Sequence, residues 1–337
     1  MTARHPLSVI TLGTAGGPRY WGPRPRSGIA TAIVVGDATY LIDAGYGAAG
    51  QLHRAGLGFE SLRGVLLTHL HSDHVVDLPG VMMFGQTAME RYPDNPLPIY
   101  GPGDRGALPP ISAGATSAPE LPNPQHPTPG TAEMVDLLIQ AFGTDYTDRI
   151  RDSLKPNPKD VFRGVDIELP AGTGFHPNEN PHPADFEPFL VHSDDRVQIT
   201  ATLVKHAPIA PAFAYRIDTE EGSVVVSGDT APSDNLVRLA RGADLLLHEA
   251  IDLDTIAAIY GRRRPEGVDA IMRHHRNAHT TPAAAGEIAA RAEVGALALH
   301  HIAPGDADPS VWLAAKSTFG RTVLVPDDLQ IIPIDRH

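Results

Sequence analysis

The stretch from residue 68 to residue 74 limits the possible folds of this chain more than any other. It has the sequence Thr-His-Leu-His-Ser-Asp-His and follows an apolar run at residues 64–67 that is typical of a buried strand. Side chains alternate along a strand, so a strand that ends at His69 and His71 places both imidazoles on one face. The stretch therefore predicts metal ligands at the carboxyl end of a strand.

The last residues of this stretch add two more metal-binding side chains. Ser72 is expected to cap a short helix, whose first turn would bring Asp73 and His74 back towards the two preceding histidines. Three imidazoles and one carboxylate exceed what a single catalytic zinc ion usually takes from a protein. We therefore predict two adjacent metal ions. A histidine-rich surface turn is the weaker interpretation, because this spacing directly follows a strand.

These four side chains together resemble the His-x-His-x-Asp-His motif of the metallo-β-lactamase superfamily; they are His69, His71, Asp73 and His74. The resemblance implies an α/β fold, the αββα sandwich of that superfamily, with a two-metal hydrolytic site at the edge of its sheets.

Three later residues match the remaining ligand positions of the superfamily in order, each after an expected strand: His206, Asp229 and His301. The choice of His301 over His300 rests on the family pattern, which places the ligand fifth in Leu-Ala-Leu-His-His. The resemblance implies that the ligands divide between two ions. One ion takes His69, His71 and His206, the other takes Asp73, His74 and His301, and Asp229 bridges them.

Three further motifs look like those of the ribonuclease Z and arylsulfatase-like branch: Ser-Gly-Asp-Thr at 227–230, His-Glu-Ala at 248–250 and Ala-His-Thr-Thr at 278–281. In that branch the histidine of the last motif donates a proton near the leaving group, and His279 matches it. Glu249 matches an acidic residue that orients this histidine. Asp73 is a further catalytic candidate, as a proton relay, whereas His248 is interpreted as a buried structural imidazole.

The composition limits the choice of metal. The chain has 337 residues and no cysteine, so it offers neither disulfides nor thiolate ligands. Imidazole and carboxylate ligands suit zinc, manganese or iron. We expect two divalent ions per chain, with Zn²⁺ favoured over Mn²⁺ or Fe.

The same composition bears on location. A chain without cysteine fits a cytoplasmic protein. No apolar run approaches the roughly 18 residues of a membrane span. Residues 1–6 show no export segment, so a cytoplasmic location without a membrane partner is expected.

Two parts of the sequence are expected to support the site: Asp43 and residues 13–17. Asp43 matches a family residue that holds the metal-bearing loops in place. The glycine-rich residues 13–17 are interpreted as a tight turn near the metals rather than a phosphate-binding loop, because the Gly-Lys-Ser/Thr ending is missing. Helices are predicted over residues 79–91, which include Met89, and from His279 onwards.

The composition changes between residues 104 and 195, where much of the chain is rich in Pro, Ala and Gly. We interpret the whole chain, 1–337, as a single metallo-β-lactamase-fold domain with this insertion between the first and third metal motifs. The spacing of the apolar residues predicts an amphipathic helix over residues 131–142, and residues 157–188 are expected to be loop-like. The insertion is either a lid over the site or a surface feature such as a homodimer contact.

The leading functional hypothesis is a two-metal hydrolase of a small ester-type substrate: a phosphodiester, sulfate ester, carboxylic ester or lactone. A metal-activated hydroxide would attack the substrate, and His279 would protonate the leaving group. The alternative is a ribonuclease Z-type endonuclease that processes the 3′ end of tRNA. A third hypothesis, a metal-bound sensor without turnover, is disfavoured by the complete ligand set.

Two features argue against nucleic acid as the partner and for a small molecule. The net charge is -13, from 27 basic and 40 acidic residues, whereas phosphate contacts dominate nucleic-acid affinity. Ribonuclease Z also carries a long tRNA-gripping arm between the third histidine ligand and the bridging aspartate. Here only two expected strands and a short turn join His206 to Asp229.

Overall fold

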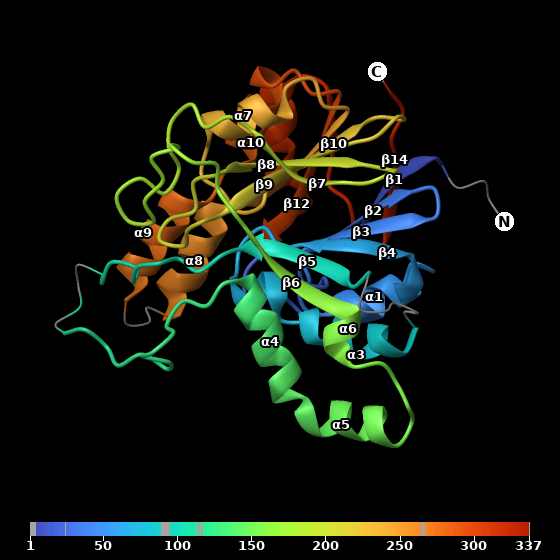
Figure 1. Cartoon of the computed structure of the whole chain (residues 1–337). Helices are drawn as coiled ribbons and strands as arrows, with labels where there is room; N and C mark the ends of the chain where they lie inside the picture. The colour runs from blue at the N-terminus through green and yellow to red at the C-terminus, as the bar shows by residue number, and fades with distance from the viewer. Residues whose placement is uncertain are drawn as a thin grey trace.

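Two seven-stranded sheets pack face to face, with helices on the outer face of each sheet (Figure 1). The computed structural model describes residues 5–23, 25–88, 95–112, 115, 117–263 and 267–336. This arrangement confirms the predicted αββα sandwich.

The first sheet has the strand order β14-β1-β2-β3-β4-β5-β6. Its strands are β14 Gln330–Pro333, β1 Leu7–Gly13, β2 Ala30–Val35, β3 Ala38–Ile42, β4 Leu62–Leu66, β5 Leu97–Pro102 and β6 Phe162–Ile167. Strands β14 to β3 pair antiparallel, and β3 to β6 pair parallel. Parallel pairing brings the carboxyl ends of β3, β4 and β5 to one edge.

The second sheet has the order β13-β12-β11-β10-β9-β8-β7. Its strands are β13 Thr322–Leu324, β12 Ala296–Ala303, β11 Leu245–Ile251, β10 Ser223–Val226, β9 Phe213–Asp218, β8 Gln198–Leu203 and β7 Phe189–Ser193. Strands β10 to β13 are parallel, so the segments that follow β10, β11 and β12 also share one edge.

Helices cover both outer faces (Figure 1). On the side of the first sheet lie α1 Ala48–Arg54, the 3-10 helix Phe59–Ser61, α2 Ser72–Val75, α3 Leu78–Ala88, α4 Thr131–Ala141 and α6 Pro158–Val161. Helix α5 Gly143–Arg151 follows α4 and lies farther from the sheet (Figure 1). On the second sheet lie α7 Asp234–Ala240, α10 Pro282–Arg291, the 3-10 helix Pro309–Leu313 and α11 Ala314–Phe319. Helices α8 Leu253–Arg263 and α9 Val268–Ala278 lie together beside one end of the sandwich.

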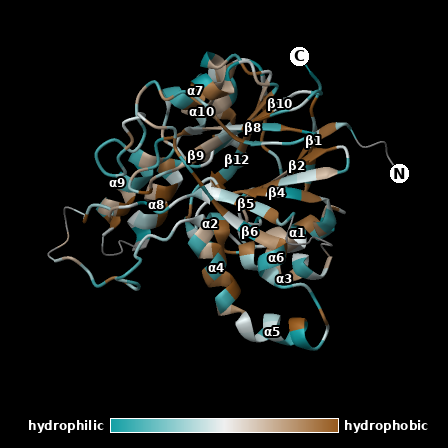
Figure 2. Cartoon of the chain, in the orientation of Figure 1, coloured by the Kyte–Doolittle hydropathy of each residue, from teal (hydrophilic) through white to brown (hydrophobic). Residues whose placement is uncertain are grey.

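The inner strands β1, β2, β3, β10 and β11 are buried on both faces, which explains their continuous apolar sequences. In β3, Tyr40 and Ile42 pack between the two sheets, while Leu41 packs with the helices outside the first sheet. Hydrophobic residues accordingly run along the strands in the interior of the molecule (Figure 2). This rigid framework fixes the edge from which the site residues project. Among the described residues, every helix falls short of the length and apolar character that a transmembrane span requires.

Three local predictions differ from the structure. Helix α2 begins at Ser72 itself, and the capping position is His71, without a side-chain hydrogen bond. Helix α3 starts at Leu78, and Met89 lies outside the described residues. The helix expected to open at His279 begins instead at Pro282.

The segment 104–195 is more regular than predicted. The expected helix is present as α4, but the expected loop at 157–188 contains α6 and β6. Strand β6 extends the first sheet by pairing with β5, and β7 extends the second by pairing with β8. The strands were missed because their sequences do not alternate cleanly; in β6 only Phe162 and Ile167 are buried. The assignment of the whole chain to one domain stays a prediction.

Candidate metal centre

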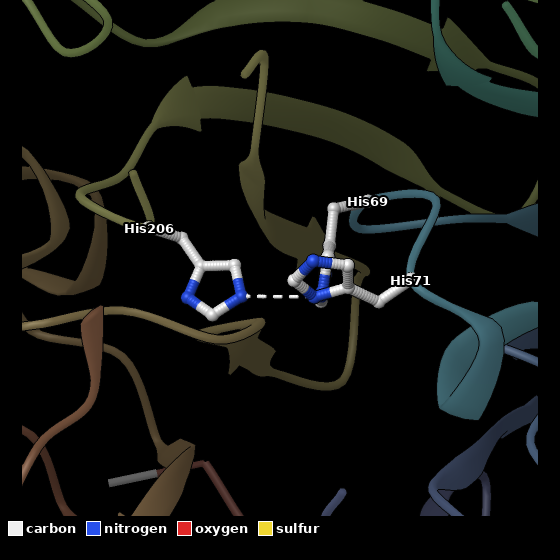
Figure 3. A group of neighbouring side chains, drawn as sticks. All are labelled: His69, His71 and His206. Carbon is white, nitrogen blue, oxygen red and sulfur yellow. Dashed lines mark hydrogen bonds between the residues drawn. The ribbon is translucent and has the colours of Figure 1, made fainter. Parts of the chain in front are cut away.

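Three histidine rings from the two halves of the sandwich converge at the shared edge (Figure 3). His69 and His71 lie on the segment between β4 and α2, and His206 follows β8. His69 Nε2 lies 2.9 Å from His71 Nδ1, which lies 3.2 Å from His206 Nε2. The structure thus brings together the three side chains that were predicted to hold one ion.

A second group lies beside the first. Asp73 and His74 lie on α2, and His301 lies on β12. His74 Nε2 is 3.2 Å from His301 Nε2, and His301 Nε2 is 3.3 Å from Asp73 Oδ2. These are the three side chains that were predicted to hold the other ion.

A backbone irregularity selects His301 rather than His300. The pairing of β11 with β12 shifts by one residue here, so that Glu249 pairs with His300 and Ala250 pairs with Ile302. His301 is left unpaired, and its φ of 47° is in the left-handed region. The bulge turns the His301 ring towards His74, with His301 Nε2 3.2 Å from His74 Nε2.

The carboxylate of Asp229 lies between the two groups. Its Oδ1 is 3.3 Å from His74 Nε2 and 3.2 Å from His301 Nε2. Its Oδ2 is 3.7 Å from His206 Nε2 and 4.0 Å from His69 Nε2. One oxygen therefore faces each group, which is the arrangement that a bridging ligand requires. Bridging by Asp229 stays a prediction, and this geometry is compatible with it.

The donor set fits metal ions better than it fits a hydrogen-bonded cluster. Asp229 Oδ1 has no hydrogen-bond partner in the described part of the chain, although it is buried. Burial and the neighbouring imidazoles lower the pKa of His69 well below its usual value, so the ring is neutral and able to coordinate. A buried group of imidazoles and carboxylates with converging lone pairs can form a dinuclear metal site.

Asp43 and Ala278 hold two of these histidines from behind. Asp43 Oδ2 is 2.8 Å from His74 Nδ1, and the same carboxylate accepts hydrogen bonds from the backbone N–H and the hydroxyl of Thr68. His206 Nδ1 lies 2.8 Å from the carbonyl oxygen of Ala278. Both contacts favour the tautomer that leaves Nε2 free for a metal. The hydrogen bonds agree with the supporting role expected of Asp43.

Asp43→Asn is expected to weaken metal binding by about 10–100-fold without unfolding the protein. An amide has one acceptor oxygen, so it cannot accept both from the Thr68 N–H, as Oδ1 of Asp43 does, and from His74 Nδ1, as Oδ2 does. Competition with a chromogenic chelator measures the affinity of each ion. Asp77→Asn is the matched control, because the Asp77 carboxylate accepts from the backbone N–H of Ala49 and contacts no predicted ligand. Equal affinities in the Asp43 variant and the wild type would contradict the supporting role.

The glycine-rich turn after β1 passes close to the second group of ligands. The backbone N–H of Gly17 donates a hydrogen bond to Asp73 Oδ2 at 3.0 Å. A Cβ atom at Gly16 would lie 2.5 Å from His301 Nδ1, so a side chain there would displace the imidazole. The structure agrees with the interpretation of this stretch as a tight turn near the metals.

His279 and Glu249 form a pair at the rim of the metal centre. His279 Nδ1 is 3.0 Å from Glu249 Oε1 and 3.9 Å from Asp229 Oδ2. Burial disfavours the charged imidazolium, but the carboxylate of Glu249 outweighs burial and raises the pKa of His279 to about 9. His279 is therefore protonated at neutral pH, as a proton donor must be.

The position of His279 differs from the expected helix start. It follows the last residue of α9, and α10 begins three residues later with Thr281 as its cap. The carboxyl end of a helix favours a positive charge, whereas the amino end disfavours it. The α9 terminus therefore supports the imidazolium of His279.

Other histidines lie close to the centre. His248 is fully buried, which lowers the pKa of its imidazole to about 4, in agreement with a structural interpretation. Sequence reasoning found no context for His274 and His275. The His274 ring on α9 lies 5.8 Å from the His206 ring and 5.7 Å from the His279 ring, measured between centroids. His274 lies five residues before His279 and His275 four, and this proximity was the only indication in the sequence.

Proteins of similar sequence match almost the whole chain. Residues 23–87 match the family model described as Metallo-beta-lactamase superfamily. The Ribonuclease Z of Mycobacterium bovis is 31% identical over 335 residues, which cover 97% of this chain and 98% of that protein. The Ribonuclease Z of Mycolicibacterium gilvum is 31% identical over 340 residues, which cover 97% of this chain and 96% of that protein.

Solved structures also share the fold over nearly their full length. The short form of human tRNase Z has a TM-score of 0.62 at 21% identity, covering 97% of this chain and 99% of that chain. The metallo-beta-lactamase fold protein YhfI from Bacillus subtilis has a TM-score of 0.60 at 20% identity, covering 98% and 99%. At these identities the likeness concerns the fold alone.

Proposed function

The chain belongs to the metallo-β-lactamase superfamily and, within it, to the ribonuclease Z family, and we propose that it is a two-metal endoribonuclease that cleaves precursor tRNA near its 3′ end. The chain is a metal-dependent hydrolase of this superfamily. The proposal of an RNA substrate is carried by one observation: 31% identity to a Ribonuclease Z along 97% of the chain.

The expectation of a small-molecule partner, with nucleic acid disfavoured, is wrong. The relatives that match along the whole chain are ribonucleases, and a similar fold is that of a tRNase Z. The net charge gave the wrong prediction because it is a sum over the whole chain, whereas binding of phosphate depends on the charges near the binding surface. The missing arm between His206 and Asp229 excludes one way of holding RNA and leaves others open.

The predicted ligands support this proposal chemically. We propose zinc as the ion at both positions, because buried imidazoles and carboxylates without sulfur suit it. Two such ions would lower the pKa of a shared water and stabilise the negative charge that develops on the scissile phosphate. In the proposed roles, Asp229 holds the two ligand groups at a fixed separation, and Asp73 ligates while it relays a proton.

His279 is the proposed proton donor. Hydrolysis of an RNA phosphodiester releases a ribose oxygen, which is a poor leaving group until it is protonated. Glu249 keeps the His279 ring charged and holds it by a hydrogen bond at Nδ1, so that Nε2 is left to donate. The arylsulfatase-like part of the resemblance and the cytoplasmic location stay predictions.

The zinc-loaded protein is expected to cut a precursor tRNA with a 3′ trailer at one position and to lose this activity on chelation. Gel analysis of an end-labelled transcript gives the position and the rate at physiological salt. Mature tRNA without a trailer is the control substrate. Hydrolysis of small esters without any cleavage of the precursor would contradict the proposed function.

A further inference from the structure

A cavity of about 280 Å³ adjoins the first group of metal ligands. We call it the flanking pocket. Leu70, which lies between His69 and His71, forms one wall, and Ile209, three residues after His206, forms another. Pro129 and Met134 close it from the segment 104–195. The pocket therefore lies between the segments that carry predicted metal ligands and the segment 104–195, which was interpreted either as a lid or as a surface feature.

The walls of the flanking pocket are largely apolar side chains that the hydrophobic core does not fully cover. Leu70 and Met134 are each partly buried against the core cluster of the first sheet, and the rest of each side chain faces outward. Its volume falls near the lower end of small-molecule sites, roughly 300–1,000 Å³. That size suits a single base better than a base pair.

Arg105 contributes a buried cation to the wall of the pocket. The residue is 8% exposed, and its Nη2 donates to the carbonyls of Pro177 and Pro208 at 3.1 and 3.0 Å and to Asn178 Oδ1 at 2.7 Å. Nη1 donates to the carbonyl of Ala107, and Nε has no partner among the described residues. Every acceptor is therefore a neutral oxygen.

No carboxylate in the described part of the chain pairs with this guanidinium. Asp104, its neighbour in sequence, instead accepts hydrogen bonds from the Thr128 hydroxyl and the Gly106 N–H. A buried charge without a counter-charge is costly, and an anion in the pocket would offset that cost. An apolar wall beside an uncompensated cation is complementary to a base attached to a phosphate.

We propose that the flanking pocket binds one unpaired nucleotide of the RNA next to the scissile phosphate. Its base packs against Leu70, Met134 and Pro129, and its phosphate is drawn by the charge of Arg105. Single-stranded RNA is held in this way by contacts to base faces and by cations along the backbone. The inference rests on the proposed function. It assigns a nucleotide subsite to the pocket that Pro129 and Met134 of the segment 104–195 help to form.

Filling the pocket tests the apolar wall. Met134→Trp is expected to raise KM for a precursor tRNA about tenfold or more, because the indole takes the place of the base. Met134→Leu, of similar volume, is the matched control and is expected to stay within about twofold. Both variants are expected to keep their metal content and their kcat/KM for methyl 4-nitrophenyl phosphate, which carries no second ring to occupy the pocket.

Pro129→Trp fills the pocket from a loop instead of a helix, and it decides the matter if Met134→Trp does not fold. A filled variant with normal metal content, normal activity on the small ester and an unchanged KM for the precursor would overturn the pocket assignment. A wild-type protein that cleaves no RNA would overturn the proposed function and this inference together. The two failures are therefore distinguishable.

Arg105→Gln tests the charge. It is expected to raise KM for the precursor about tenfold and to reduce the slope of log KM against log salt concentration by about 1, as loss of one phosphate contact does. Arg105→Lys is expected to keep the slope, since it retains the charge. An unchanged slope in Arg105→Gln would show that Arg105 only joins loops and would overturn its role towards phosphate.

Discussion

Asp229→Ala is expected to empty both metal positions and to lower the rate of RNA cleavage by about 10³-fold or more. Each oxygen of this carboxylate faces a different group of ligands, with Oδ1 3.2 Å from His301 Nε2 and Oδ2 3.7 Å from His206 Nε2. Its removal would take one ligand from each ion. It would also take away the negative charge that offsets two neighbouring cations, so neither ion would be held as before.

Elemental analysis of the purified protein measures the outcome, with about two ions per chain expected in the wild type. Asp234→Ala is the matched control, because Asp234 lies on the surface, where it pairs with Arg291. Loss of a single ion in Asp229→Ala would remove its bridging role, and loss of neither would exclude it as a ligand. Full activity of metal-free wild-type protein would contradict the metal centre as a whole.

His279→Ala is expected to slow cleavage of RNA and of alkyl phosphodiesters by about 10²–10⁴-fold, while both ions stay bound. The ribose or alkyl oxygen must be protonated as it leaves. Nitrophenyl esters are expected to lose far less activity, because nitrophenolate leaves without a proton. The measurement is kcat/KM for both substrate types beside metal content.

His53→Ala, an exposed histidine on α1, is the control for this variant. Equal losses on both substrate types would show that His279 is structural. Loss of an ion would show that it is a ligand, which its distance of 3.9 Å from Asp229 Oδ2 makes a real alternative.

Glu249 gives this assignment a pH signature. The pKa of His279 is raised to about 9, so the acid form is present below that pH and the rate falls as pH rises through it. Glu249→Gln removes the carboxylate that raises this pKa while its amide oxygen still accepts from the Thr230 N–H. The alkaline limb of kcat/KM is therefore expected to move to lower pH. If the alkaline limb of the pH profile did not move, Glu249 would not be the group that sets the pKa of the proton donor.

The sequence alone determined the family, the αββα sandwich and the candidate ligands. This was possible because the informative features are local. Strand β4 stops at Leu66, so His69 and His71 lie just beyond it on the segment that leads into α2, and the first turn of α2 brings Asp73 and His74 back towards them. Each later candidate follows or ends a strand, and strand periodicity is visible in a single sequence. Their role as ligands stays a prediction.

Local patterns did not predict how distant segments pair. Strand β6 belongs to the first sheet because it pairs with β5, and β7 belongs to the second because it pairs with β8. The sequences of β6 and β7 alternate too weakly to predict either strand. His279 was expected to open a helix, but it directly follows the last residue of α9, and α10 begins three residues later. The substrate class was misjudged from net charge for the same reason: a total says nothing of where the charges lie.

Tertiary structure alone decided the geometry of the site. His74 and His301 are far apart in the chain, and their nitrogens approach to 3.2 Å because α2 follows a strand of one sheet and His301 lies in a bulge of the other. The bulge arises from the pairing of β12 with β11, so no spacing within Leu-Ala-Leu-His-His distinguishes its two histidines physically. The flanking pocket likewise exists only where the loops after β4 and β8 meet the segment around α4. The ligand that this pocket prefers depends on side chains from distant parts of the chain, which only the tertiary packing brings side by side.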